Sequence, residues 1–301
     1  MQAANETKKG VINALCAYTL WGIAPIYFKL LSMVPAMEIL VHRIVWSFVL
    51  LVAIVLLMGN WSKVRAIYRD RKKLAWLFFT SLILAANWLL FIWAVNNDYI
   101  LEASLGYYIN PLFSVALAML FLGERLSRWQ LVAVALAMVG VLIQLISLGS
   151  VPYVALGLAT SFGVYGLLRK KMPVDSLPGL LIESFWMLPL GLLYWAFFAE
   201  SATSNMMLND MSLNVTLIAA GLVTTAPLLF FTAAAKRLPL TTMGFFQYVG
   251  PSIMFVLAIT VYNEQLIFEK MLTFAFIWSA LVIYSIDSLK KRRQRKRQAN
   301  S

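Results

Sequence analysis

Ten long apolar runs divide this chain, and each is long enough to cross the hydrocarbon core of a membrane. Hydrophobic residues make up 61% of the 301 residues and charged residues 13%, which leaves too little polar surface to cover a water-soluble fold. The segments between the runs are too short for a soluble domain. The sequence therefore predicts an all-α polytopic membrane protein with ten transmembrane helices, at about residues 11–31, 37–58, 74–94, 101–122, 128–147, 152–169, 178–198, 213–235, 240–262 and 270–288.

The first run follows Lys8 and Lys9, as the apolar part of a cleaved signal peptide would. It continues through Trp21 and Pro25 without a small-residue cleavage pattern, so we expect the helix to be retained. The single cysteine, Cys16, lies inside this run and is expected to be a small packing residue.

The chain also contains an internal repeat. Residues 86–126, moved forward by 140 positions, align with residues 226–266 and are identical at ten of the 41 positions, where apolar composition alone gives about three. The identical landmarks include Tyr108 with Tyr248, Pro111 with Pro251 and Glu124 with Glu264. The protein is therefore expected to consist of two copies of one unit.

Basic residues indicate the orientation, because Lys and Arg are retained in short cytoplasmic loops. With the amino terminus placed inside, the cytoplasmic segments hold 22 of the 25 Lys and Arg residues, whereas the opposite loops contain Asp98, Glu200 and Asp210. Both termini are therefore expected to be cytoplasmic. The net charge of +12 follows from this bias and from the tail, so nucleic-acid binding is not required, and we expect the tail to meet anionic lipid headgroups.

Each unit has five spans, and because five is odd, the second copy enters the membrane from the opposite side. We expect inverted repeats at residues 1–149 and 150–289, followed by a basic cytoplasmic tail at 290–301. Inverted units can exchange roles, which gives two states of similar energy that open to opposite sides. This is the architecture of alternating access. The alternative is that duplication is only a simple route to a helical bundle.

Arg43 in the second span and Glu183 in the seventh occupy equivalent positions in the two halves. A charge inside a span costs at least about 2.5 to 3.5 kcal/mol, so such residues normally face a partner or a wet cavity. Each has a tryptophan three residues later on the same helical face, Trp46 and Trp186. We expect these four side chains to line a site for a small zwitterionic or amphipathic solute.

A structural role is the alternative for these residues. Arg43 is only about five residues inside its span and could snorkel, or pair with Glu38, to hold the bundle together. His42, the single histidine, could also pair with Glu38 or sense protons, and helix-end packing is the simpler interpretation.

The paired prolines predict helix hinges. Pro111 cannot donate to the carbonyl of Tyr107, nor Pro251 to that of Gln247, so each leaves a free backbone acceptor near the middle of the membrane. Polar and aromatic residues lie beside them, and a polar stripe facing lipid would be costly. We therefore expect further substrate-binding residues here and in the third span: Asn87, Tyr107, Tyr108, Asn110, Gln247 and Tyr248.

Several longer stretches resemble the RarD subgroup of the EamA-type drug/metabolite transporter superfamily. They are NWLLFIWAVNN at 87–97, LEASLGYYINP at 101–111, LGERLSR at 122–128 and GFFQYVGP at 244–251. The resemblance covers nearly the whole chain. It implies two inverted EamA-like repeats in a bacterial inner membrane and a permease that works as an exporter. The subgroup carries the label of a chloramphenicol-sensitivity protein, which describes a phenotype and leaves the natural substrate open.

Other classes of function lack the residues they need. With one His, one Cys and neither H-E-x-x-H nor G-x-S-x-G, the sequence favours neither an enzyme nor a metal or cofactor site. The expected function is transport of a small molecule bound between the two halves. The fifth and tenth spans are expected to be outer helices, or the contacts of a homodimer. The alternative is a membrane scaffold or sensor without transport activity.

Overall fold

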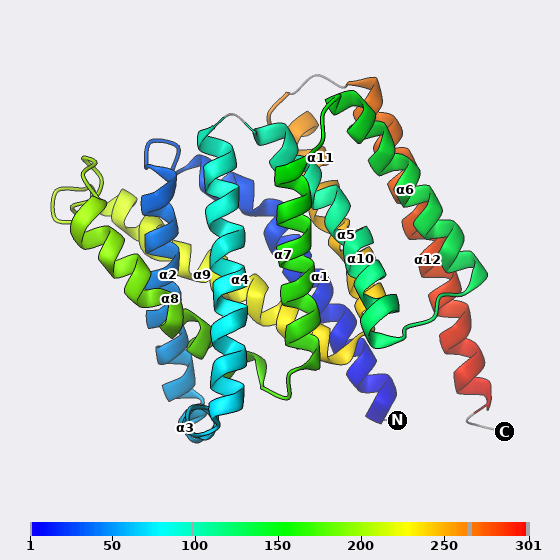
Figure 1. Cartoon of the computed structure of the whole chain (residues 1–301), viewed down its shortest axis with the longest axis horizontal. Coiled ribbons are helices and arrows are strands. Elements are labelled where there is room, and N and C mark those ends of the chain that lie inside the picture. The colour runs from blue at the N-terminus through cyan, green and yellow to red at the C-terminus, as the bar shows by residue number, and fades with distance from the viewer. Residues whose placement is uncertain (1, 98, 264–266, 299–301) are drawn as a thin grey trace.

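The computed structural model describes residues 2–97, 99–263 and 267–298, and every regular element in this part of the chain is a helix (Figure 1). Glu264 and Asp98 lie outside the described residues. In chain order the helices are α1 (Gln2–Lys29), α2 (Ala36–Leu57), α3 (Trp61–Arg69), α4 (Arg71–Asn96), α5 (Ile100–Leu122), α6 (Arg128–Leu148), α7 (Tyr153–Lys171), α8 (Ser176–Phe198), α9 (Met211–Arg237), α10 (Leu240–Gln247), α11 (Val249–Thr260) and α12 (Phe268–Gln298).

Nine helical segments of the described chain are long and apolar enough to cross a membrane, and α10 and α11 together form one of them. The predicted sixth span corresponds to α7, which has 19 residues and ends in Arg169, Lys170 and Lys171, so its composition is less apolar. The ten predicted spans thus correspond to α1, α2, α4, α5, α6, α7, α8, α9, α10–α11 and α12. The predicted all-α membrane architecture is confirmed. The short helix α3 between the second and third spans was not predicted.

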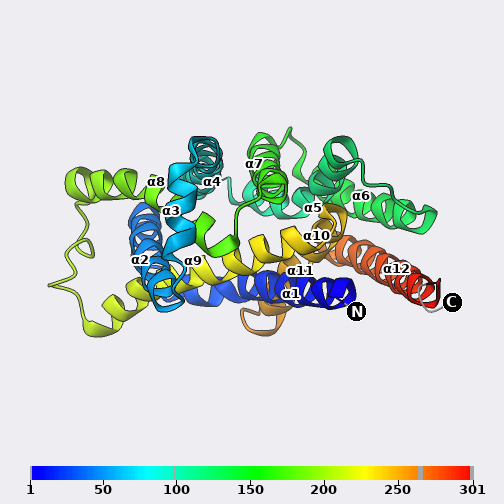
Figure 2. The same cartoon turned by 90° about the horizontal axis from the view of Figure 1, so that it is seen from below.

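The two halves are interleaved. Figure 2 shows two rows of helices, one with α8, α4, α7, α5 and α6 and the other with α2, α9, α1, α11 and α12, so each row mixes both halves. The packing also repeats when the halves are exchanged. Helix α1 packs on α9 as α7 packs on α4, α2 packs on α9 as α8 packs on α4, and α7 packs on α5 as α1 packs on α11. The equivalent helices α2 and α8, α5 and α10, and α6 and α12 pack on each other. This exchange is the relation expected of two copies of one unit, and their inversion stays a prediction.

The two equivalent prolines lie in different backbones. Helix α5 continues through Pro111, whereas the corresponding segment is divided at Tyr248, between α10 and α11, three residues before Pro251. The Tyr248 amide donates to the Phe245 carbonyl at 3.2 Å, a tighter turn than that of an α-helix. Sequence identity predicted two similar kinks, and only the second unit has a break. The role of either proline as a hinge stays a prediction.

Glu124 holds the start of α10. Its carboxylate accepts from the backbone amides of Leu240 at 2.7 Å and Thr241 at 2.9 Å, and from the Thr241 hydroxyl at 2.7 Å. The first amides of a helix have no partner within it and carry partial positive charge, so a carboxylate is well placed there. The glutamate found in the repeat therefore ties the end of α5 to the start of α10.

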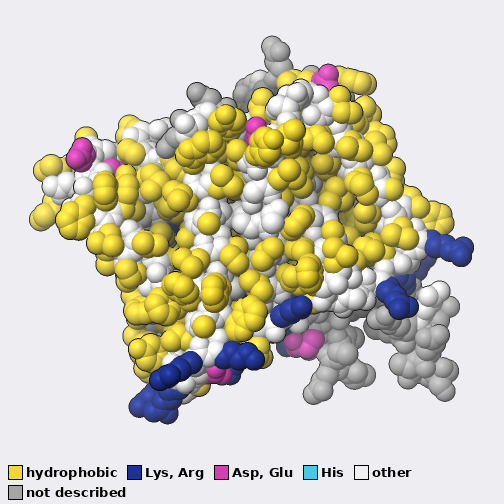
Figure 3. Space-filling model, viewed as in Figure 1, with side chains coloured by type: hydrophobic (Ala, Val, Ile, Leu, Met, Phe, Trp, Pro, Cys, Tyr) yellow, Lys and Arg dark blue, Asp and Glu magenta, His cyan; other side chains and the backbone are white. Residues whose placement is uncertain are grey.

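Charge is distributed unevenly over the molecule. In Figure 3 the Lys and Arg side chains gather along the lower edge of the visible face, and most of the remaining face is hydrophobic. Both termini lie at this same lower end in Figure 1. We refer to it below as the basic end.

Candidate substrate-binding site

Arg43 lies among side chains from three other helices. From α2, its Nε donates a hydrogen bond of 2.8 Å to the Thr224 hydroxyl of α9. The guanidinium carbon is 4.8 Å from the ring centroid of Trp88 in α4 and 5.6 Å from that of Phe28 in α1. Cation–π contacts of this kind contribute about 0.5 to 2 kcal/mol each, depending on desolvation. They partly offset the cost of holding a charge within the membrane.

Two phenol groups complete this surrounding. Tyr27 and Tyr107 are both close enough to Arg43 to interact with its charge. The Tyr27 hydroxyl donates to the Thr216 carbonyl at 2.7 Å, and its ring lies edge-on to Phe28 at 5.2 Å. Tyr107 is 43% exposed, and its hydroxyl has no hydrogen bond to any described residue. We call Phe28, Arg43, Trp88, Tyr107 and Thr224 the Arg43 cluster.

No carboxylate of the described chain forms an ion pair with Arg43. The expected alternative partner, Glu38, instead accepts from Ser201 at 2.7 Å and Thr203 at 3.0 Å. His42 accepts a hydrogen bond of 3.2 Å from Trp46. Glu38 and His42 therefore both serve packing near the start of α2. Arg43 therefore carries a charge that Glu38 does not neutralise.

Glu183 lies in a separate cluster. Its side chain is fully buried, and it accepts from the Thr80 hydroxyl at 2.5 Å and from the Tyr165 hydroxyl at 3.3 Å. Arg169 Nη1 is 3.8 Å from the Glu183 carboxylate, and none of the Arg169 side-chain nitrogens has a hydrogen bond in the described structure. The pair is therefore a buried ion pair with loose geometry, in which the low polarity of the surroundings strengthens the attraction while desolvation opposes it.

Glu183 pairs with Arg169, near the end of α7, and the pocket that Arg43 and Glu183 were predicted to share stays a prediction. A small cavity of about 10 Å³ is lined both by Glu183 and by Thr224, the hydrogen-bond partner of Arg43. That volume holds about one water molecule. The role of Glu183 in substrate binding stays a prediction.

The other predicted site residues take part in helix contacts. Asn87 donates to the Leu158 carbonyl at 3.0 Å and to the Ser161 hydroxyl at 2.8 Å, which joins α4 to α7. The side-chain amide of Gln247 donates a hydrogen bond of 3.3 Å to the Ser114 hydroxyl of α5.

Further predicted residues pack at the other helix junctions. The Tyr248 hydroxyl donates to the Tyr108 carbonyl at 3.2 Å, and the Tyr108 ring packs on Phe274 at 5.7 Å. The Trp186 ring packs edge-on to Phe78 at 5.0 Å. Trp186 Nε1 and Asn110 Oδ1 are buried and have no hydrogen-bond partner in the described structure. Of the predicted residues, the structure therefore brings Tyr108 together with Tyr248, and Arg43 close to Tyr107.

Sequence reasoning missed Thr224, Phe28 and Tyr27 as residues of the site. Thr224 and Thr225 form a polar pair inside the apolar span α9, three residues before Pro227, and that pair was the available signal. Aromatic residues give no such signal, because they are common as packing residues and interface anchors in membranes. Within the described residues, no three His, Cys, Asp or Glu side chains form a group that could hold a metal ion.

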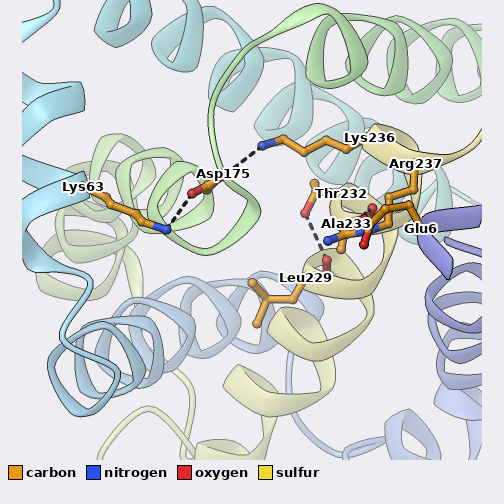
Figure 4. A network of polar contacts seen from close by, with 8 residues as sticks. All are labelled: Glu6, Lys63, Asp175, Leu229, Thr232, Ala233, Lys236 and Arg237. Carbon is orange, nitrogen blue, oxygen red and sulfur yellow. Dashed lines mark hydrogen bonds and ion pairs between the residues drawn. The ribbon is translucent and has the colours of Figure 1, made fainter. Parts of the chain in front are cut away.

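The basic end is tied together by ion pairs (Figure 4). Asp175, just before α8, contacts Lys63 of α3 at 2.9 Å and Lys236 of α9 at 3.3 Å, while Arg237 of α9 contacts Glu6 of α1 at 2.9 Å. Lys170 of α7 also donates to the carbonyls of Ala235 and Leu238, at the end of α9. Helices from both halves are thus joined at this end.

Asp175→Asn is expected to weaken this end in a pH-dependent way. Hydrogen bonds from Lys63 and Lys236 hold the pKa of the Asp175 carboxyl below its ordinary value. A lowered pKa stabilises the folded state above the unfolded value, and the contribution disappears as the pH falls through the folded value. Because Asp175 is exposed, we expect the variant to lose less than about 1 kcal/mol at pH 7. Thermal unfolding in detergent should show the two proteins converging below about pH 4, whereas an unchanged difference at lower pH would contradict this assignment.

Known proteins share this sequence and fold. Residues 8–146 match the model of the EamA-like transporter family. An "Uncharacterized transporter" of Vibrio cholerae is 56% identical over 285 residues, which cover 95% of this chain and 94% of the relative. "Protein RarD" of Escherichia coli is 53% identical over 291 residues, with 97% and 98% covered.

A solved structure with 17% sequence identity covers 93% of this chain and 98% of its own, with a TM-score of 0.74, and so shows the same fold. The similarity to the two relatives runs over nearly the whole chain and so includes its second half. The chain therefore belongs to the EamA-like transporter family, as a transporter of the RarD type within the drug/metabolite transporter superfamily.

Proposed function

We propose that this protein is a permease of the bacterial inner membrane that exports small amphipathic metabolites or drugs by alternating access. The observation that carries the proposal is the Arg43 cluster. A charged side chain held within a span without a carboxylate partner in the described structure is costly. Such residues usually mark the path of a substrate or ion. The family membership supplies the transport activity, and the cluster supplies a place where a solute can bind.

The basic end is assigned to the cytoplasm, so both termini are cytoplasmic. Lys and Arg are retained on that side of the membrane, and Figure 3 shows them along one edge. Helix α1 starts at this end and α2 therefore starts at the other, which places Arg43 nearer the outer face. The basic tail in α12 is assigned to anionic lipid headgroups on the same side.

The exchange of contacts between the halves supports alternating access. The ion pairs of Asp175 and Glu6 join helices at the basic end, so we assign the present structure to a state closed toward the cytoplasm. The opposite state requires those pairs to separate while the outer helix ends approach each other. Helices α6 and α12 pair at one edge of the molecule (Figure 2) and are assigned to lipid or homodimer contact.

Counterflow into proteoliposomes tests this proposal. Purified protein should exchange at least one labelled solute from a panel of organic acids, amino acids, related zwitterions and chloramphenicol faster than protein-free vesicles do. Arg43→Gln should reduce that exchange at least tenfold, since a hydrogen bond to a charged group contributes about 1.5 to 3 kcal/mol.

The matched control is Arg65→Gln, which removes the same charge from an exposed position on α3 and should leave the exchange unchanged. A folded protein that exchanges no solute of any class would contradict the proposal and favour a scaffold or sensor.

A further inference from the structure

We propose that the Arg43 cluster binds the anionic group of the transported molecule, and that the substrate is a small organic anion with a flat apolar body. This inference rests on the proposed transport function and defines the substrate class of the same site. It replaces the zwitterion that the sequence favoured, because Glu183, which was expected to recognise the ammonium group, is paired with Arg169.

The first step is the set of unused donors on Arg43. A guanidinium has five N–H groups, and only the Nε–H of Arg43 is used, by Thr224. The two terminal amino groups make no hydrogen bond to any described residue. Neither amino group is a fully buried atom without a partner, so both have accessible surface. Four N–H donors in one plane thus remain available, and two of them can hold a carboxylate in a bidentate pair.

The second step is the orientation of those donors. Trp88 and Phe28 contact the guanidinium with their ring faces, and the bond to Thr224 fixes the Nε edge. A planar cation fixed in this way presents its terminal edge to one direction only. Arginine recognises carboxylates by this edge, and the stacked aromatic rings leave it free.

The third step is the charge balance. A zwitterion needs a carboxylate for its ammonium group, and the buried glutamates of the neighbouring spans are all engaged. Glu183 is paired with Arg169, Glu38 accepts from Ser201 and Thr203, and Glu102 accepts from the Val154 amide at 3.0 Å. The titratable groups close enough to interact with the charge of Arg43 are the phenols of Tyr27 and Tyr107. The cluster therefore offers one positive charge and no negative charge from these residues.

The fourth step is the apolar surface next to the donors. Tyr107 is 43% exposed, and its ring is 6.3 Å from that of Phe91. Its hydroxyl is free to donate a hydrogen bond within the described structure, while its ring can contact an apolar group. A flat body attached to the anion would therefore lie against Tyr107.

Binding of four matched probes to the purified protein tests the inference. The probes are benzoate, benzylamine, benzyl alcohol and phenylalanine, which share a phenyl ring and differ in charge, and the protein is held in nanodiscs of phosphatidylcholine. Benzoate is expected to bind at least tenfold more tightly than the other three. Arg43→Gln should weaken benzoate at least tenfold, and Arg43→Lys should recover only part of the loss, because lysine keeps the charge without the planar fork. Arg65→Gln should leave benzoate binding unchanged.

Other results would overturn the inference in distinguishable ways. If phenylalanine or benzylamine binds as tightly as benzoate in an Arg43-dependent manner, the substrate class is wrong while transport stands. If benzoate binding is lost when phosphatidylglycerol is added to the nanodiscs, the site takes a lipid phosphate instead. If no probe binds and the counterflow panel is also negative in protein with an unchanged unfolding temperature, both this inference and the proposed function fail.

Discussion

Replacing Glu183 with glutamine is expected to destabilise the protein by about 3 to 5 kcal/mol, because removing one partner of a buried ion pair leaves the other charge uncompensated. Glu183 has no exposed surface, and Arg169 is 3% exposed. The remaining arginine would have no other hydrogen bond among the described residues, since its three side-chain nitrogens already lack one. Unfolding in mixed micelles with an increasing share of a denaturing detergent measures the difference in free energy of unfolding between the variant and the parent.

A double variant provides the matched control for this prediction. Glu183→Gln combined with Arg169→Met removes both charges and replaces the arginine with an apolar side chain of comparable length. Removing both charges of a buried pair leaves no uncompensated charge, and replacement of whole buried pairs is often neutral. The double variant should therefore recover most of the stability that the single variant loses. A single variant within about 1 kcal/mol of the parent would contradict the assignment of Glu183 and Arg169 as a buried ion pair.

Gly221→Ala is expected to have the second large effect on stability, about 1 to 3 kcal/mol of destabilisation through overpacking. Helix α9 meets α2 so closely here that a Cβ at Gly221 would lie 2.4 Å from the Trp46 carbonyl carbon and 2.6 Å from its oxygen. The backbone of α2 cannot yield as the end of a flexible side chain can. The hydrogen bond of 3.3 Å from Ser47 to the Gly221 carbonyl would be disturbed as well.

Gly191→Ala is the control for that prediction. Gly191 lies on α8 and also faces α2, but the nearest atom to an added Cβ is 3.5 Å away on the Ile44 side chain, which is an ordinary contact. The same unfolding assay should show little change for this variant. Equal losses at both glycines would indicate a general cost of substitution in these helices, and not a close approach of α2 and α9.

Sequence reasoning is sufficient for the spans and insufficient for their pairing. Each span must satisfy its own backbone hydrogen bonds in lipid, so a long apolar run can become only a helix. The way the halves interleave depends on contacts between distant residues, such as Thr224 with Arg43. The charge pattern also left one contact unpredicted. Arg169 belongs to a basic group at the end of a span, and its side chain is buried against Glu183.

The repeat was informative about architecture and less so about detail. Identical residues at Pro111 and Pro251 predicted similar kinks, and the structure has a continuous α5 beside a divided α10 and α11. The residues before the prolines differ, Asn110 in one unit and Gly250 in the other, but the break at Tyr248 comes before Gly250, which lies within α11. Identity at a landmark of the repeat thus does not fix the local backbone.

Cysteine accessibility at position 107 tests the central claim most directly. In a Cys16→Ser background, Tyr107→Cys places a single thiol in the Arg43 cluster, and a membrane-impermeant maleimide is applied to right-side-out or inside-out vesicles. Alternating access predicts labelling from the outer face in the state described here, and faster labelling from the cytoplasmic face when Asp175→Ala removes the ion pairs with Lys63 and Lys236. Labelling from one face only, unchanged by Asp175→Ala, would contradict the account.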